Sequence, residues 1–410
     1  MRVIVVGGGP AGMMAAGQAA KAGADVLLLE KNARLGKKLA ITGKGRGNLT
    51  NAASLDEFIA QYPGNGTFLY GALARFSNED LRRFFHEWGV PTMVERGGRV
   101  FSCSQRAQDL VEALKKFLKT YGVQVQYGCK VTALLQEGGR VAGVRANGRN
   151  ILADAVVLAT GGASYPATGS TGDGYRLAQK VGHTITPILP ALIPLETAET
   201  WVKELAGLTL KNVAVKLAVN KRIVAEEFGE MLFTHYGLSG PIILTLSRHA
   251  AQALNKKQKV SVHLNLKPAL TAEQLDARIL RDFAKNIRKQ FKNSLNDLLP
   301  QKLIAPVINL SGIPPELPVH QISKEQRLRL QEILTDLTFT VKAVRPLKEA
   351  IVTAGGVVTK EIDPATMASK ILPGLYFAGE IIDVDGNTGG YNLQAAFSTG
   401  YVAGNSAAKI

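Results

Sequence analysis

The chain has 410 residues, enough for two to three domains of about 150 residues and for a large hydrophobic core. Its 42 glycines follow no fixed period, which excludes a collagen-like fold and indicates many tight turns. A net charge of +16 suits an anionic partner, whereas the presence of only two cysteines, Cys103 and Cys129, excludes a disulfide framework and a multi-cysteine metal site.

The first residues form an apolar strand pattern that runs directly into glycines, without the longer apolar stretch and cleavage site of a signal peptide. No later stretch reaches the length of a membrane span, about 18 consecutive apolar residues. We therefore expect a cytoplasmic protein without a membrane span.

The first thirty residues predict a strand, a glycine turn, a helix and a second strand, over 2–6, 7–12, 13–22 and 25–30. This order is typical of the start of a parallel α/β sheet. Two helices and a series of strands are expected next, the helices over 79–88 and 107–121 and the strands over 123–127, 131–136, 141–146 and 151–158.

The pattern changes around Pro187, Pro190 and Pro194. Beyond them, alternating strands are predicted over 213–219 and 260–266, and helices over 271–292 and 324–334. After Pro346 the parallel-sheet pattern returns and ends in a helix. We therefore expect an α/β nucleotide-binding domain formed by residues 1–189 and 346–410, interrupted by an α+β insertion over 190–345.

The turn Gly7-Gly-Gly-Pro-Ala-Gly12 matches the dinucleotide fingerprint in a strand-turn-helix context. Gly7 permits the tight turn, Gly9 lets the backbone approach a pyrophosphate, and Gly12 allows close packing of helix and strand. The helix N-terminus favours phosphates, and Glu30 ends the second strand, where an acid binds a ribose diol. The cofactor residues predicted from this motif are Gly7, Gly9, Pro10, Ala11, Gly12, Glu30 and, as a neighbour of the acid, Lys31.

FAD and NAD both present an ADP moiety to the first turn, so that turn does not distinguish them. The C-terminal motif does. A short strand ends in Gly379-Glu380, and a glycine-rich loop leads into a final helix. This resembles the second fingerprint of two-motif FAD enzymes, in which the acid binds the ribityl chain and the helix N-terminus faces the flavin pyrimidine edge. The residues predicted here are Gly379, Glu380, Gly390, Tyr391, Asn392 and Leu393, with Thr160 and Gly161 as a third flavin element.

Three longer motifs, over 43–51, 231–241 and 354–394, resemble the bacterial BaiN-type, aminoacetone-oxidase-like and YhiN-like family of FAD-binding flavoproteins. The resemblance covers essentially the whole chain. It implies a Rossmann-type FAD domain with an insertion that has a β-barrel-like part, about 190–268 and 336–345, and a helical part, about 269–335. It also implies that the flavin pocket includes Gly47, Asn48 and Thr50, with Lys38 near the adenosine or phosphates and the backbone of Val131 at the adenine.

The sequence lacks the residues that two kinds of site require, namely the redox cysteine pair of a disulfide reductase and the ligand set of a metal. Pyridine-nucleotide disulfide reductases need two redox cysteines a few residues apart, and Cys103 and Cys129 are too distant in sequence. A second dinucleotide domain for NAD(P)H is also missing, so a reduced nicotinamide would act only as a transient hydride donor. The histidines have no metal-ligand spacing, so we predict no metal.

For proton transfer, the best candidate is His235 with Tyr236, which lie in a glycine-flanked turn of the insertion. An equally weighted alternative is that His235 only hydrogen-bonds the two domains together. Tyr165, which follows the Thr160-Gly-Gly turn, is the second candidate donor. Arg46 is assigned to an anionic substrate or a phosphate.

The charge is spread unevenly, at +10 over residues 1–186, +8 over 187–345 and −2 over 346–410. Basic residues recur at helical spacing along one predicted face, at Arg278, Arg281, Lys285, Arg288 and Lys292. Such a face binds nucleic acid or an acidic membrane in some proteins, but a solvated helix face is the favoured interpretation.

These observations predict an FAD-dependent oxidoreductase that transfers hydride between flavin N5 and a small organic substrate, and the favoured reaction is the NAD(P)H-linked reduction of an activated C=C bond. One alternative is an amine oxidase that acts on a substrate such as aminoacetone and produces peroxide. An alternative of another class is an FAD-containing protein that binds RNA or a partner through its basic insertion. The substrate and the oligomeric state stay open.

Overall fold

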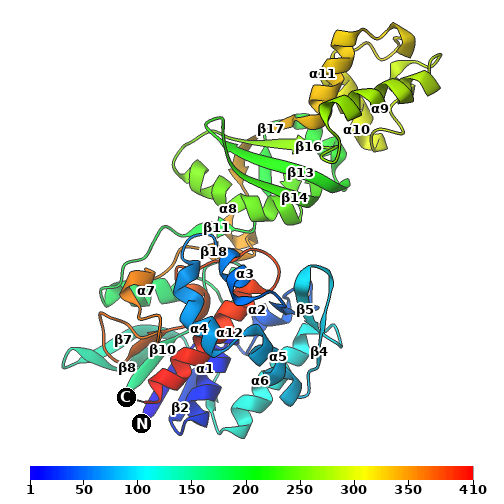
Figure 1. The fold of residues 1–410 in the computed structure, drawn as a ribbon. Helices are drawn as coiled ribbons and strands as arrows, with labels where there is room; N and C mark the ends of the chain where they lie inside the picture. The colour runs from blue at the N-terminus through cyan, green and yellow to red at the C-terminus, as the bar shows by residue number, and fades with distance from the viewer. Residues whose placement is uncertain (410) are drawn as a thin grey trace. The chain divides into compact units, whose positions relative to one another are not determined.

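The computed structural model describes residues 1–409. Contacts between Cα atoms divide the chain into two compact units, which we call the Rossmann unit, Met1–Pro190 with Leu347–Ile410, and the inserted unit, Ala191–Pro346. Blue N-terminal and red C-terminal segments lie together in the Rossmann unit (Figure 1). Within the described residues, no helix combines the length and apolarity that crossing a membrane requires.

The Rossmann unit is built on a five-stranded sheet. Its strands are all parallel and run in the order β19 (Leu375–Phe377), β10 (Ala155–Leu158), β1 (Arg2–Val6), β2 (Asp25–Leu29) and β6 (Gln124–Gln126). Residues Val3 to Val6 of the central strand are buried, which explains why the strand reads as a continuous apolar run. The predicted α/β fold class is confirmed by this sheet.

Helices α1 (Pro10–Lys21) and α12 (Tyr391–Ala407) lie side by side against the sheet (Figure 1). Their close approach depends on glycine, because a Cβ on Gly400 would lie 2.4 Å from the Ala11 carbonyl oxygen and one on Gly404 2.2 Å from that of Ala15. The C-terminal helix therefore completes the same core that the N-terminal fingerprint begins.

The remaining elements of the Rossmann unit surround this core. The helices are α2 (Lys37–Ala40), α3 (Leu55–Ala60), α4 (Tyr70–Arg75), α5 (Asn78–Glu87), α6 (Ala107–Thr120) and α7 (Asp173–Lys180). Small sheets are formed by β3 (Asn48–Asn51), β4 (Thr92–Val94) and β5 (Arg99–Ser102), by β7 (Val131–Glu137), β8 (Arg140–Ala146) and β9 (Arg149–Leu152), and by β11 (Leu189–Ala191) and β18 (Val352–Ala354).

The single strand predicted over 151–158 is wrong, because the structure has two strands there in different sheets. β9 pairs with β8, whereas β10 pairs with β1 and β19. Between them, the Asp154 carboxylate accepts a hydrogen bond from the backbone N–H of Arg2 at 2.6 Å, and the Asp154 N–H donates to the Arg2 carbonyl at 3.0 Å. These bonds end the hairpin and direct the chain into the parallel sheet.

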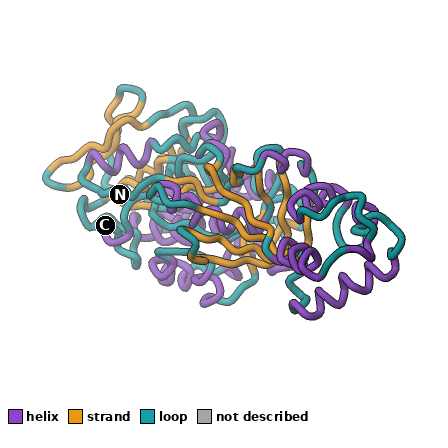
Figure 2. The backbone as a smooth tube through the Cα atoms, turned by 90° about the horizontal axis from the view of Figure 1, so that it is seen from above, coloured by secondary structure: helices purple, strands orange, loops and turns teal. Residues whose placement is uncertain are grey.

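The inserted unit contains a closed, antiparallel six-stranded barrel, so the predicted barrel-like part is confirmed. Figure 2 draws the strands of the chain in orange and its helices in purple. Its order is β12 (Leu195–Thr197), β15 (Gly237–Ser239), β14 (Arg222–Thr234), β13 (Thr209–Val219), β16 (Val260–Asn265) and β17 (Leu337–Val344). Buried and more exposed residues alternate along β16, as expected for a strand with one face in a barrel core. Helix α8 (Pro241–Asn255), which the sequence did not predict, packs against this barrel.

The helical part consists of α9 (Ala272–Lys285), α10 (Gln301–Ser311) and α11 (Lys324–Thr335). The helix predicted over 271–292 is too long, since α9 ends at Lys285. Phe291 lies fully buried, and its N–H donates to the Leu317 carbonyl at 2.9 Å. Burial of this ring and pairing with the 317–319 segment replace the last predicted helical turns.

Candidate functional site

A cavity of about 740 Å³ lies in the Rossmann unit, at the carboxyl ends of β1, β2, β10 and β19. Its volume is within the roughly 300–1,000 Å³ of ligand and cofactor sites, and ligands bind at this edge of open parallel sheets. Many of the residues predicted from sequence line it: Gly7, Gly9, Pro10, Ala11, Glu30, Lys31, Lys38, Val131, Thr160, Gly161, Tyr165, Gly379, Glu380, Asn392 and Leu393.

The glycine turn leaves space for a ligand at one position only. A Cβ on Gly7, at φ +108°, would lie 2.5 Å from the Ala159 carbonyl oxygen, and one on Gly12 would lie 1.8 Å from that of Gly7. A Cβ on Gly9 would meet nothing within 4 Å, although Gly9 lines the cavity. The open space therefore lies at the N-terminus of α1, where backbone N–H groups and the helix dipole favour an anion.

The Glu30 carboxylate is fixed at the edge of the cavity. It is 6 % exposed and accepts hydrogen bonds of 2.7 Å from the Gly8 N–H and from the backbone and side-chain N–H groups of Asn32. Each carboxylate oxygen can accept more than one hydrogen bond. The acid is thus oriented by the protein and keeps capacity for ligand hydroxyls.

Lys31 lines the same end of the cavity but is already paired. Its ammonium lies 2.6 Å from the Asp173 carboxylate and donates to Thr171 Oγ1 at 2.6 Å. Burial acts to raise the pKa of Asp173, but hydrogen bonds from Lys31 and Thr171 and the charge of Lys31 lower it to about 2. Since this cation is neutralised by Asp173, it is a poor partner for a ribose phosphate, and the binding of a ribose by Glu30 stays a prediction.

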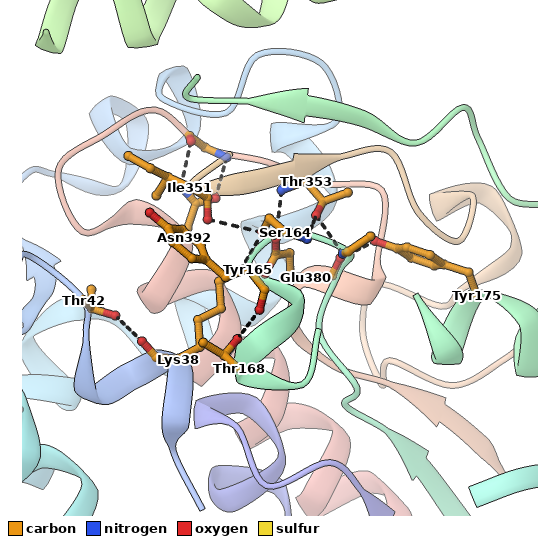
Figure 3. A network of polar contacts seen from close by, with 12 residues as sticks. Lys38, Thr42, Ser164, Tyr165, Thr168, Tyr175, Ile351, Thr353, Glu380 and Asn392 are labelled. Atoms are coloured by element: carbon orange, nitrogen blue, oxygen red, sulfur yellow. Dashed lines mark hydrogen bonds and ion pairs between the residues drawn. The ribbon is translucent and has the colours of Figure 1, made fainter. Parts of the chain in front are cut away.

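A second polar network joins three segments that are far apart in sequence (Figure 3). The Lys38 ammonium lies 2.8 Å from the Glu380 carboxylate and 2.8 Å from Ser164 Oγ. The other Glu380 oxygen accepts from the Thr353 N–H at 2.8 Å and from Ser164 Oγ at 3.2 Å. Burial acts to raise the pKa of Glu380, but the charge of Lys38 and these hydrogen bonds hold it below its ordinary value. Glu380 is therefore an ionised, fully oriented carboxylate in the cavity wall.

The start of α12 forms another part of the wall, through Asn392 and Leu393. Gly390, at φ +102°, approaches so closely that a Cβ would lie 2.3 Å from the Thr50 carbonyl oxygen. The Asn392 amide bonds the backbone of Gly386 through its oxygen at 2.8 Å and its nitrogen at 2.7 Å. Tyr391 packs away from the lining, 4.8 Å from the Phe58 ring centre. The sequence Gly390-Tyr-Asn-Leu thus holds the glycine loop and directs a helix N-terminus towards the cavity.

Several predicted cofactor residues do not line this cavity: Gly12, Arg46, Gly47, Asn48, Thr50, Gly390 and Tyr391. Arg46 is paired with Glu95, donates to Gln105 at 2.7 Å, and lies 4.3 Å from the Phe101 ring centre. Thr50 Oγ1 donates to Gln394 Oε1 at 2.7 Å inside the core. In this geometry these residues support the walls, while their predicted contact with the cofactor stays a prediction.

Sequence reasoning missed several lining residues, namely Asn32, Lys37, Thr42, Lys44, Lys130 and Val352. Asn32 had a usable signal, because it follows Glu30, the acid predicted to bind the ribose, by two residues. Val352 had none, since it lies in a short strand of the C-terminal segment, remote in sequence from every nucleotide motif.

The predicted proton donors fall in different units. Tyr165 lines the cavity and has a left-handed backbone, φ +51°. His235 and Tyr236 form the turn between β14 and β15 of the inserted unit, where His235 is exposed and the Arg345 guanidinium lies 4.6 Å from the Tyr236 ring centre. Within residues 1–409, no group of three or more His, Cys, Asp or Glu side chains could hold a metal ion.

Comparison with known proteins identifies the family. The model of the HI0933-like protein Rossmann domain matches residues 1–406. The chain belongs to the HI0933-like family. It is an FAD-dependent oxidoreductase, and the predicted family resemblance is confirmed.

Relatives of this HI0933-like protein extend over its whole length. It is 34 % identical to 3-dehydro-bile acid delta(4,6)-reductase of Clostridium scindens, over 100 % of this chain and 99 % of the relative. It is also 31 % identical to ribosomal RNA dihydrouridine synthase of Haemophilus influenzae, over 97 % and 96 %.

Solved structures share the fold at low identity. A 3-ketosteroid delta1-dehydrogenase from Sterolibacterium denitrificans has a TM-score of 0.54 at 15 % identity, over 99 % of both chains. A 3-ketosteroid-delta4-(5alpha)-dehydrogenase from Rhodococcus jostii RHA1 has a TM-score of 0.52 at 17 % identity, over 100 % of this chain and 96 % of the other. The cavity fits the cofactor of this fold, because it combines open space at Gly9 with the oriented acids Glu30 and Glu380.

Proposed function

We propose that this HI0933-like protein is an NAD(P)H-linked reductase of a C=C bond conjugated to a carbonyl group. The observation that carries the proposal is the full-length similarity to a delta(4,6)-reductase, supported by a single cavity that contains both dinucleotide motifs. Two relatives named for different substrates fit one reaction class. Dihydrouridine is uridine with a saturated C=C bond, and that bond is conjugated to a carbonyl, as is an unsaturated bond beside a 3-oxo group.

The residues proposed to hold FAD follow from the cavity wall. The N–H groups after Gly9 at the start of α1 would bind the pyrophosphate, Glu30 the ribose hydroxyls, and Glu380 the ribityl hydroxyls. The N-terminus of α12 would face the flavin ring, where its dipole favours negative charge. When bound, FAD supplies a centre that takes up a hydride from a nicotinamide and releases it to carbon.

The protein must supply a proton to balance the addition of hydride to the double bond. Tyr165 is the proposed donor within the Rossmann unit, because its side chain lines the cavity. His235 and Tyr236 stay candidate donors from the inserted unit. Overall, NAD(P)H and one proton would be consumed for each C=C bond that becomes a CH–CH bond.

Anaerobic titration of the yellow protein tests the proposal. NADH or NADPH should bleach the flavin absorbance, and a 3-oxo-4-ene steroid or a uridine-containing RNA should restore it. Bleaching by an amine without nicotinamide, with peroxide formed on admission of oxygen, would favour the aminoacetone-oxidase alternative instead. Tyr165→Phe should slow restoration by the substrate more than bleaching by the nicotinamide.

A further inference from the structure

The inserted unit carries a second basic surface, formed by two turns that are remote in sequence. One is the turn between β13 and β14, with Lys221 and Arg222, and the other is the turn between α8 and β16. We call the cluster the basic end and define it as Lys221, Arg222, Lys256, Lys257 and Lys259.

Asn220 joins the two turns. Its N–H donates to the Lys259 carbonyl at 2.9 Å, and its side-chain oxygen accepts from the Lys259 N–H at 3.1 Å. Pairing of Val219 with both Arg222 and Val260 continues this connection into the barrel. The positions of the two turns are therefore fixed by the strand register.

The charge of the basic end is not compensated locally. All five cations are exposed, and no acidic residue occurs over 219–224 or 254–260. Among residues 1–409, none of the five has a carboxylate within ion-pair distance. The basic face of α9 differs, because Arg278 pairs with Asp282 at 2.7 Å.

Lys292, the last residue of that predicted face, pairs with Glu316 at 2.7 Å. The unit as a whole has 22 Lys and Arg against 14 Asp and Glu. Arg281, Lys285, Arg288 and Lys289 of the helical part are also exposed and have no ion pair among residues 1–409. The basic end differs from them because its cations come from two turns that Asn220 joins.

We propose that the basic end binds the phosphodiester backbone of single-stranded RNA. Five exposed cations within two adjoining turns can each neutralise a phosphate. Ile223 and Val224, next to Arg222, are 53 % and 46 % exposed, which provides apolar surface for unstacked bases. The choice of RNA as the partner rests on the proposed function, because uracil carries the conjugated C=C bond. The location of the binding surface rests on the basic end alone.

An anionic membrane is the less suitable partner. Membrane-surface segments combine basic residues with a broad apolar face that contains aromatic side chains. The apolar face of the neighbouring helix α8 is instead buried, with Ile243 and Leu246 at 0 % and 1 % exposure. The exposed large apolar side chains on β14 are Ile223, Val224 and, at 63 % exposure, Phe228. They lie along one strand and do not form the broad helix face of a membrane-surface segment.

Binding of a fluorescein-labelled 20-nucleotide oligouridine to the FAD-loaded protein, followed by anisotropy, tests the proposal. With five phosphate contacts, affinity should fall about a hundredfold between 50 and 200 mM salt. The variant Lys221→Gln/Arg222→Gln/Lys257→Gln/Lys259→Gln should bind at least about tenfold more weakly at 50 mM salt, with most of the salt dependence lost.

The matched control is Arg281→Gln/Lys285→Gln/Arg288→Gln/Lys289→Gln, which removes the same charge from exposed residues of the helical part. It should bind RNA within about threefold of the parent protein, since it leaves the proposed phosphate contacts intact. Equal losses in the two variants, or a larger loss in the control, would overturn the proposal. An unchanged flavin spectrum and melting temperature show that each variant is folded.

Two further arms identify the partner. Tighter binding of a 20-base-pair DNA duplex than of the oligouridine would contradict the single-stranded RNA assignment, as would sedimentation with phosphatidylglycerol vesicles in place of RNA binding. RNA binding needs no hydride transfer. If the protein bound RNA at this surface yet failed to reduce any conjugated C=C bond, the proposed function would fail while this inference stood.

Discussion

The cavity wall of the Rossmann unit and the basic end of the inserted unit differ in whether their cations lie next to carboxylates. In the wall, Lys31 and Lys38 each lie within 2.8 Å of a carboxylate, and the acids are fixed by further hydrogen bonds. At the basic end, the cations are exposed and have no acidic neighbour in either turn. Three further lysines that line the cavity, Lys37, Lys44 and Lys130, have no ion pair among residues 1–409. The oriented pairs of Lys31 and Lys38 suit one ligand of defined shape, whereas the exposed cations of the basic end suit a polyanion of variable shape.

The largest effects are expected in the glycine turn, where one substitution should impair folding and another should impair the binding of FAD. Gly12→Ala should destabilise the Rossmann unit by about 3 kcal/mol or more, because its Cβ would lie 1.8 Å from the backbone oxygen of Gly7. Gly9→Ala should fold with a cost below about 1 kcal/mol, since its Cβ meets nothing. It should nevertheless lose FAD, because the methyl group occupies the cavity.

Thermal melting and the FAD content of the purified variants measure both effects. A Gly9→Ala protein that retains FAD at the parent affinity would show that the pyrophosphate lies elsewhere. A stable Gly12→Ala protein would show that the turn can relax.

The Lys38–Glu380 pair provides the next test. Glu380→Gln leaves the ammonium of Lys38 without its carboxylate, and the two side chains are 26 % and 20 % exposed. We expect a loss of about 1–2 kcal/mol, less than for a fully buried pair. The double variant Lys38→Met/Glu380→Gln should lose less than the sum of the single variants in urea unfolding. Additive losses would mean that the wall is not a coupled network.

Asp173 gives a pH test with a defined sign. Its pKa is lowered from 3.8 to about 2, so its ionised form stabilises the fold above pH 3.8, and this contribution is lost as the pH falls towards 2. Asp173→Asn should remove about 1–2 kcal/mol at neutral pH and flatten the stability profile between these values. The exposed residue Glu137 at the end of β7, changed to Gln, is the control and should leave this part of the profile unchanged.

The smallest effect is expected at Arg46, the arginine of the 43–51 motif. Its side chain is 38 % exposed and paired with Glu95, so Arg46→Ala should cost less than about 1 kcal/mol. FAD content should stay near that of the parent, because Arg46 does not line the cavity. A colourless Arg46→Ala protein would restore the sequence-based assignment of this residue to a phosphate.

The local motifs were readable because their chemistry depends on neighbours in the chain. The turn from Gly7 to Gly12 and the acid Glu30 lie within one strand-turn-helix-strand unit, in which spacing fixes geometry. The same holds for Asn392, which bonds the loop only six residues before it. Fold class, the presence of FAD and much of the cavity lining could therefore be predicted without coordinates.

Contacts between remote segments were not readable. Lys38 and Glu380 are 342 positions apart, and no sequence pattern pairs a lysine of a short helix with an acid that follows a strand at that distance. The helix over 271–292 failed for a similar reason, because burial of Phe291 against a later segment overrides helical periodicity.

The sequence by itself determined that the protein is an α/β flavoprotein with an insertion, because glycine spacing and strand-end acids encode the dinucleotide site locally. Only the tertiary structure decided which charges are neutralised and which are free. Strand register joins Asn220 to Lys259 and concentrates five cations at one end of the barrel. By contrast, Arg278 of α9 pairs with Asp282, and Lys292, beyond the end of that helix, pairs with Glu316. Charge compensation depends on distances in space, and the linear order of residues does not record them.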